Sequence, residues 1–242
     1  MIKKLLIFLY VIFLGPLISF HSIIRSRFKK NITCNKPNPN ILDSKTQGFL
    51  LKQQFCRYEM YLDMAEFVKK EFSSKQMNNS RIIEFGGSNG MVRQIFNHPN
   101  YEIAENYPRV DIQDLKDFES DYYSFIILDQ VLEHVANPWR AIKEVYRLLK
   151  KGGWLIVGTP FLVQIHKSPE DYWRFTKDGL AELLQGFSEK HIKSWGNKEI
   201  AVFHILLGSW PNARCIRKLT PFLFNLPNEE DYPYVIWAYA KK

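Results

Sequence analysis

A glycine-rich turn between an apolar strand and a helix most constrains how this chain can fold. Residues 81–85 (Arg-Ile-Ile-Glu-Phe) read as a short buried strand that runs directly into Gly86-Gly87-Ser88-Asn89-Gly90, and residues 91–96 continue as a helix. Glycine lacks a Cβ atom and adopts positive φ without strain, so a ligand can approach the backbone closely at such a turn. A strand–turn–helix unit with a binding turn is therefore expected.

Further strands and helices alternate along the chain. The patterns predict helices over 55–72, from Asn137 to Leu149 and over 176–184, and strands over 101–104, 122–128, 154–157 and 235–240. Pro138 follows Asn137 as at a capped helix start, and Gly152-Gly153 is expected to stop that helix. The alternation predicts an α/β fold with a mainly parallel sheet, helices on both faces, and ligands outside the carboxyl ends of the strands.

Glu84, the acid before the glycine turn, limits which ligands the turn can bind. A dinucleotide site requires Gly-x-Gly-x-x-Gly and a Walker A loop ends in Gly-Lys-Ser/Thr; counted from Gly86, neither pattern is present. Glu84 would repel a diphosphate, whereas it suits a ligand that carries an amino group or a sulfonium. S-adenosylmethionine carries both, and a plain turn without a ligand is the alternative.

Three stretches resemble a known family. RIIEFGGSNG resembles the first motif of class I S-adenosylmethionine-dependent methyltransferases, with Ser88 in place of the middle glycine. Two others, SFIILDQVLEHVANPWRAIKEVYRLLKKGGWLIVGTPF and HKSPEDYWRFTKDGL, resemble the methyltransferase type 11 family. The similarity covers roughly residues 55–200. It implies a Rossmann-like, seven-stranded, mostly parallel sheet and S-adenosyl-L-methionine as the cofactor.

The resemblance also implies roles for individual residues. Glu105 resembles the acid that holds the ribose hydroxyls, with Asn106 or Asp111 as alternatives for that place, and Asp114 resembles the polar residue near the adenine amine unless it is a solvated surface charge. The other implied cofactor-binding residues face the methionine part or line the cofactor and the transferred methyl group: Glu84, Gly86, Gly87, Ser88, Gly90, Asp129, Gln130 and Val131.

Methyl transfer to a hydroxyl is helped by a group that removes the hydroxyl's proton. His134, just beyond the predicted strand at 122–128, and His166 and Asp171, beyond the strand at 154–157, are the candidate catalytic residues. The alternative for Glu133-His134 is a structural role in capping or orienting the loop. The aromatic run from Tyr172 to Phe175 either stacks on an acceptor or forms a lid packed on the core.

The N-terminus is expected to hold the protein at a membrane. Residues 5–24 carry no charge and are mostly apolar, which favours a single membrane-spanning helix. The basic flank that follows outweighs Lys3 and Lys4, so the positive-inside rule places the domain in the cytoplasm. We therefore expect an anchor with its basic flank over residues 1–30, a linker over 31–54 and a class I methyltransferase domain over 55–242.

The charge distribution and the cysteine content argue against a nucleic-acid-binding protein and against a disulfide or zinc framework. The net charge is +8, but residues 1–42 hold seven positive side chains and no acid, which leaves 8 − 7 = +1 for the other 200 residues. No nucleic-acid partner is therefore expected. Three scattered Cys residues indicate neither a disulfide framework nor zinc, so no metal is expected.

The resulting hypothesis is a methyltransferase that acts at oxygen on a small-molecule, glycan or lipid-linked acceptor. A catalytically inactive, membrane-tethered binding module is the alternative, and the sequence predicts no oligomeric state.

Overall fold

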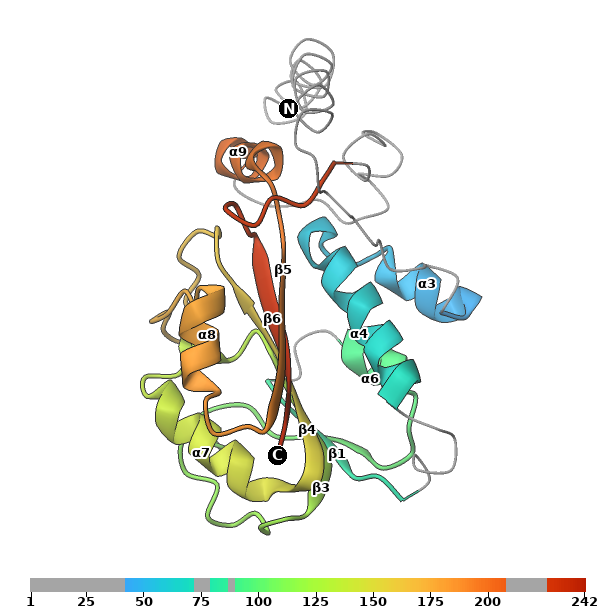
Figure 1. Ribbon diagram of the computed structural model, residues 1–242, viewed down its shortest axis with the longest axis vertical. Coiled ribbons are helices and arrows are strands. Elements are labelled where there is room, and N and C mark those ends of the chain that lie inside the picture. Colours follow the sequence, from blue (N-terminus) through green and yellow to red (C-terminus); the bar gives the residue numbers. More distant parts are fainter. Residues whose placement is uncertain (1–41, 72–78, 87–89, 208–225) are drawn as a thin grey trace.

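The computed structural model describes residues 42–71, 79–86, 90–207 and 226–242. Six strands form one sheet in the order β2-β1-β3-β4-β6-β5 (Figure 1). β1 to β4 are parallel, whereas β6 runs antiparallel to both β4 and β5. The bounds are β1 Ile82–Phe85, β2 Tyr101–Ile103, β3 Tyr123–Asp129, β4 Leu149–Pro160, β5 Glu189–Trp195 and β6 Val235–Lys241.

Helices cover both faces of this sheet, which confirms the predicted α/β fold. α3 (Ser44–Leu50), α4 (Tyr58–Glu71) and α6 (Met91–Phe96) lie on one face, and α7 (Pro138–Leu148) and α8 (Lys177–Leu183) on the other (Figure 1). α9 (Lys198–Leu207) lies beyond one end of the sheet. Two short 3-10 helices, η3 (Phe55–Arg57) and η4 (Leu132–His134), complete the described elements.

The core consists of two apolar layers that the strands separate. Successive strand residues point to opposite faces. Ile82 and Ile127 therefore pack with the α3, α4 and α6 layer, whereas Ile83 and Ile126 pack with the α7 and α8 layer. All four residues of β1 are buried, as expected of a parallel strand covered on both sides.

A buried acid fixes α4 to the antiparallel edge of the sheet. The carboxylate of Asp63 accepts hydrogen bonds from Lys193 Nζ at 2.6 Å, from Trp237 Nε1 at 2.8 Å and from the Tyr239 hydroxyl at 2.7 Å. These donors lie on β5 and β6, so the bonds hold the helix in one register above both strands.

The predicted helix starts are confirmed, but one predicted end is wrong. The Asn137 side chain accepts a hydrogen bond from Arg140 N at 3.1 Å, and the Thr176 hydroxyl accepts one from Gly179 N at 3.0 Å. However, α7 ends at Leu148 and the glycine pair belongs to β4. Leu149 already pairs with Tyr123 of β3, so the sheet takes up the residues that the local pattern assigned to the helix end.

The expected seventh strand is absent from the described residues. Residues 104–122 connect β2 to β3 through turns and bends. This segment is rich in charged side chains and contains Pro108, which has no backbone donor for a sheet ladder. Ile112 and Leu115 are buried and anchor it to the core instead.

The structure describes part of the predicted linker but not the predicted anchor. Residues 1–41 lie outside the described residues, so the anchor stays a prediction. Within 31–54, Ser44–Leu50 form α3, with Asp43 accepting hydrogen bonds from Lys45 N and Thr46 N at its start. This stretch packs on the core through Leu50 rather than serving as a simple linker. No helix among the described residues is long and apolar enough to cross a membrane.

Candidate active site

The carboxyl ends of the parallel strands bring the predicted site residues to one edge of the sheet. Ala104 N donates to Glu84 O at 2.9 Å, which places Glu105 beside the end of β1. Gln130 N donates to Gly158 O at 2.8 Å, which joins the ends of β3 and β4. The glycine turn, Glu105 and Gln130 therefore lie at the same edge, as the parallel topology requires.

Glu84 is a buried acid at this edge. Its side chain is 1% exposed, and Oε2 accepts a hydrogen bond from the Tyr101 hydroxyl at 2.6 Å. Burial raises the pKa of Glu84 to about 7, and the nearby carboxylate of Asp129 adds to that rise against the opposing effect of the Tyr101 hydrogen bond. A cationic ligand beside Glu84 would therefore favour its charged form.

The turn requires glycine at two described positions. Gly86 has φ +88°, and a Cβ atom there would lie 2.5 Å from Val131 Cγ2. Gly90 has φ +68° and begins α6. Val131 thus closes on the backbone of the turn, as expected for residues that line one cofactor. Gly87 and Ser88 lie outside the described residues.

Asp129 and Gln130 stand at the end of β3, and Gln130 lines the cavity beyond it. Asp129 is 1% exposed, and its Oδ2 accepts a hydrogen bond from the Tyr61 hydroxyl of α4 at 2.7 Å. Gln130 has φ +60°, a conformation that costs a non-glycine residue energy and that is concentrated at functional sites. The Gln130 backbone thus has an uncommon conformation at the strand end, where its side chain lines the cavity.

The residues assigned to the ribose and adenine lie on the exposed part of this edge. Glu105 is exposed, and its Oε1 lies 3.1 Å from Arg109 Nη1. Asp111 accepts a hydrogen bond from Gln113 N at 2.9 Å, so it shapes a turn. Asp114 is exposed and lies 3.6 Å from Lys116 Nζ. Glu105 therefore keeps the predicted position, and the contacts of Asp114 match the alternative of a solvated surface charge.

The three candidate catalytic residues come together around Glu133, which is 0% exposed. Its Oε1 lies 3.6 Å from His134 Nε2 and 3.7 Å from His166 Nε2. The two imidazole rings are 5.0 Å apart, and His166 N donates to Asp171 Oδ2 at 2.8 Å. The Glu133 carboxylate facing its ring raises the pKa of His166.

Asp171 is held by Arg174 rather than presented to the cavity. Arg174 donates from Nη1 and from Nη2 to the two oxygens of Asp171, and these bonds hold the pKa of Asp171 at about 2. Trp173 Nε1 donates to Val135 O at 2.9 Å, and Phe175 is buried. The aromatic run therefore packs on the core, as in the lid interpretation, although Tyr172 is exposed.

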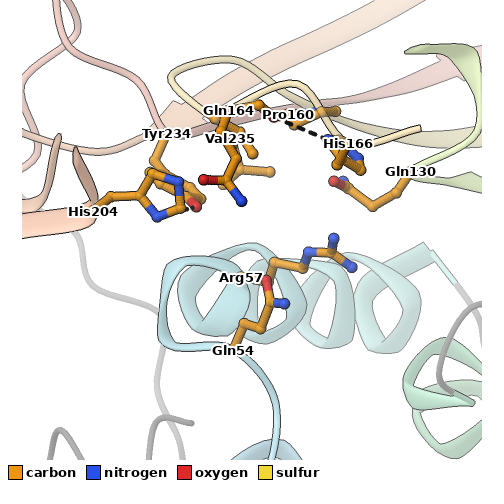
Figure 2. Close-up of a pocket in the computed structure, with 10 residues that line it drawn as sticks. Gln54, Arg57, Gln130, Pro160, Gln164, His166, His204, Tyr234 and Val235 are labelled. Carbon is orange, nitrogen blue, oxygen red and sulfur yellow. Dashed lines mark hydrogen bonds between the residues drawn. The ribbon is translucent and has the colours of Figure 1, made fainter. Parts of the chain in front are cut away.

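A cavity of about 170 Å³ lies next to this cluster (Figure 2). Pockets that enclose whole drug-sized ligands measure roughly 300–1,000 Å³, so this one suits the reacting end of an acceptor. Figure 2 shows Arg57 and Gln54 on one side, across from Gln130 and His166. The complete lining is Gln54, Arg57, Gln130, Pro160, Val163, Gln164, His166, His204, Tyr234 and Val235.

Sequence reasoning missed most of this lining. The Tyr234 hydroxyl lies 3.1 Å from His204 Nδ1, which joins α9 to the start of β6. Neither residue stands in a recognisable motif, and no spacing rule connects them with Arg57. Only the positions of Gln130 after β3 and His166 after β4 gave a signal.

The comparisons with known proteins identify the family of this chain. The model of a family described as "Methyltransferase domain" matches residues 56–199, which is more than half of the chain. The chain belongs to this methyltransferase domain family. Its matched region is thus an S-adenosyl-L-methionine-dependent methyltransferase domain, and S-adenosyl-L-methionine is its cofactor.

Two proteins are similar to this chain, one by its solved structure and one by its sequence. A solved structure from Thermotoga maritima, an S-adenosylmethionine-dependent methyltransferase described as a possible histamine N-methyltransferase, is 18% identical with a TM-score of 0.50. The match covers 84% of this chain and 97% of that one. An uncharacterized protein of Methanocaldococcus jannaschii is 30% identical over 88 residues, which are 32% of this chain and 43% of the relative. The matched part thus spans less than half of that relative.

Proposed function

We propose that the whole protein transfers the methyl group of S-adenosyl-L-methionine to an oxygen atom of a small-molecule, glycan or lipid-linked acceptor. The observation that carries this proposal is a single sheet edge on which Glu84, the glycine turn and a cavity with a polar wall meet. In the reaction, the acceptor's oxygen–carbon bond forms as the sulfur–methyl bond breaks, S-adenosylhomocysteine leaves, and the hydroxyl's proton is released.

The buried acid and the glycine turn support the cofactor half of the proposal. The carboxylate of Glu84 favours the cationic methionine end, and Gly86 lets Val131 approach the backbone. We assign the ribose hydroxyls to Glu105, because a carboxylate at the end of β2 accepts two hydroxyl hydrogen bonds well. Asp114 is assigned to the adenine amine on the resemblance alone.

The polar cluster supports the acceptor half. A methyltransferase has to align the nucleophile with the carbon–sulfur bond and exclude water. His166 lines the cavity, and His134 and Asp171 lie beside the His166 ring. These three residues are therefore proposed to assist removal of the acceptor's proton. Placement in the type 11 branch of methyltransferases is part of this proposal.

Attachment to a membrane, with the domain in the cytoplasm, is proposed on the apolar segment at 5–24 and the basic residues after it. Val202 and Ile205 of α9 are 45% and 78% exposed, which supports contact of this helix with an apolar surface. An acceptor at the membrane follows from such an attachment.

The test combines cofactor binding with methyl transfer. Calorimetry of the full-length chain with S-adenosyl-L-methionine is expected to show binding, and radiolabelled cofactor with fractionated cell extract is expected to label a glycan, lipid or small-molecule fraction. Absence of binding would refute the proposal, and binding without any label transfer would favour the inactive module. A chain without residues 1–30 tests the membrane acceptor. If it methylates only soluble acceptors, and does so as well as the full chain, the proposal of an acceptor at the membrane would be refuted.

A further inference from the structure

Three groups that can bind a metal ion converge on one point beside the cavity. Glu133 Oε1, His134 Nε2 and His166 Nε2 offer ligand atoms that all lie within 4.8 Å of one another. Glu133 follows β3 in η4, whereas His166 follows β4, so the parallel pairing of these strands brings them together. Neither oxygen of the fully buried Glu133 side chain has a hydrogen-bond partner among the described residues.

The second nitrogen of each imidazole fixes which atom faces Glu133. His134 Nδ1 lies 2.5 Å from Glu170 O, and His166 Nδ1 lies 3.3 Å from Gln164 O and 3.5 Å from Asp171 Oδ2. These oxygens only accept hydrogen bonds, so each Nδ1 carries the proton. With the proton on Nδ1, the neutral form of each imidazole presents its Nε2 lone pair towards the Glu133 carboxylate, and three such atoms facing one another can hold a cation between them.

The distances favour a metal ion over a shared proton. The separations of 3.6 and 3.7 Å between Glu133 Oε1 and the two Nε2 atoms exceed the reach of a hydrogen bond. Two ligands at about 2.1 Å from one tetrahedral ion lie about 3.4 Å apart, close to these values. The backbone carbonyls of Glu170 and Gln164, which lie behind the rings of His134 and His166, match the outer hydrogen bonds that orient metal-bound histidines.

We propose that Glu133, His134 and His166 bind one divalent first-row transition-metal ion, such as Zn²⁺ or Mn²⁺. One carboxylate and two imidazoles form a ligand set with open coordination positions, and the nitrogen ligands disfavour Mg²⁺ and Ca²⁺. His166 and Gln130 both line the cavity, so the open positions face the acceptor (Figure 2).

The ion gives the cluster a defined chemical role, and this role, unlike the binding of the ion, rests on the proposed function. An acceptor hydroxyl bound at an open position loses its proton to water more readily, because the metal lowers its pKa. The oxygen then attacks the methyl carbon as the sulfur–carbon bond breaks. Asp171 acts as a positioning residue, because it fixes the His166 ring rather than touching the acceptor.

The test measures metal binding directly. The untagged full-length chain is stripped with a chelator and dialysed against Zn²⁺ or Mn²⁺ for elemental analysis, and Co²⁺ is added separately to record its visible absorption. One equivalent of ion is expected per chain. His166→Gln and Glu133→Gln are each expected to weaken binding tenfold or more. His191→Gln, which removes an exposed imidazole paired with Glu189 on β5, is the matched control and is expected to bind as the wild type does.

Three outcomes would overturn the proposal: no bound ion in the wild type, unchanged binding by His166→Gln, or equal loss of binding by His191→Gln. The His166→Gln result decides the matter should Glu133→Gln fail to fold, because His166 is 35% exposed and tolerates replacement better than a buried acid. Calorimetry with S-adenosyl-L-methionine on the stripped chain separates the two proposals. Cofactor binding and methyl transfer without any metal would refute the ion's role in the reaction and leave the proposed function intact.

Discussion

Replacing Glu84 with glutamine should stabilise the protein at alkaline pH while weakening cofactor binding. The folded state raises the pKa of Glu84 from 4.5 to about 7, mainly through burial. A raised pKa in an acid means that the folded state prefers the protonated form. The stability linked to Glu84 is therefore complete below pH 4.5 and is lost as the pH rises towards 7.

The magnitude follows from the size of that shift. A difference of 2.5 pKa units corresponds to about 3.5 kcal/mol, at about 1.4 kcal/mol per unit. Glutamine does not ionise, and its carbonyl still accepts the hydrogen bond from Tyr101. The free energy of unfolding of Glu84→Gln, relative to that of the wild type, should thus increase by up to about 3 kcal/mol as the pH rises from 4.5 to 8, which means that the variant is stabilised.

Urea-induced unfolding of the full-length chain at both pH values measures this difference. Comparing two pH values cancels any change in packing, because the packing change is present at both. Glu102→Gln on β2, where the carboxylate is exposed, is the matched control and should alter the difference by less than about 0.5 kcal/mol. In the same preparations, calorimetry should show at least tenfold weaker binding of S-adenosyl-L-methionine by Glu84→Gln. A stability difference that does not change with pH would refute the reasoning.

Three further substitutions test the turn, the α4 anchor and a helix cap. Gly86→Ala should abolish detectable cofactor binding in calorimetry and lower the free energy of unfolding by about 1–3 kcal/mol, because φ is +88° and the new Cβ atom would meet Val131. Cofactor binding as strong as that of the wild type would contradict this prediction. Asp63→Ala should lower the free energy of unfolding in urea by about 2–4 kcal/mol, since three donors lose their acceptor, and a loss below 1 kcal/mol would count against it. Asn137→Ala should cost about 1 kcal/mol through the lost cap of α7, as measured by thermal unfolding, and unchanged stability would show that the cap contributes nothing.

The sequence by itself determined the features that depend on neighbours in the chain. The starts of α7 and α8 at Asn137 and Thr176 follow from side chains that bond to the backbone three residues on. The buried strand at Glu84 and the turn at Gly86 follow from an apolar run and from glycine's freedom at positive φ. Such interactions are short-range, so a local pattern is enough to predict them.

Tertiary structure alone decided which distant side chains meet. The Tyr101 hydroxyl reaches Glu84 because β1 and β2 pair in parallel, and His166 faces Glu133 because β3 and β4 pair in one register. The end of α7 was mispredicted for the same reason, since Leu149 joins the ladder with Tyr123. Strand register and helix packing are set by the whole core, where many weak contacts add up. Residues far apart in the sequence carry no local signal of that sum.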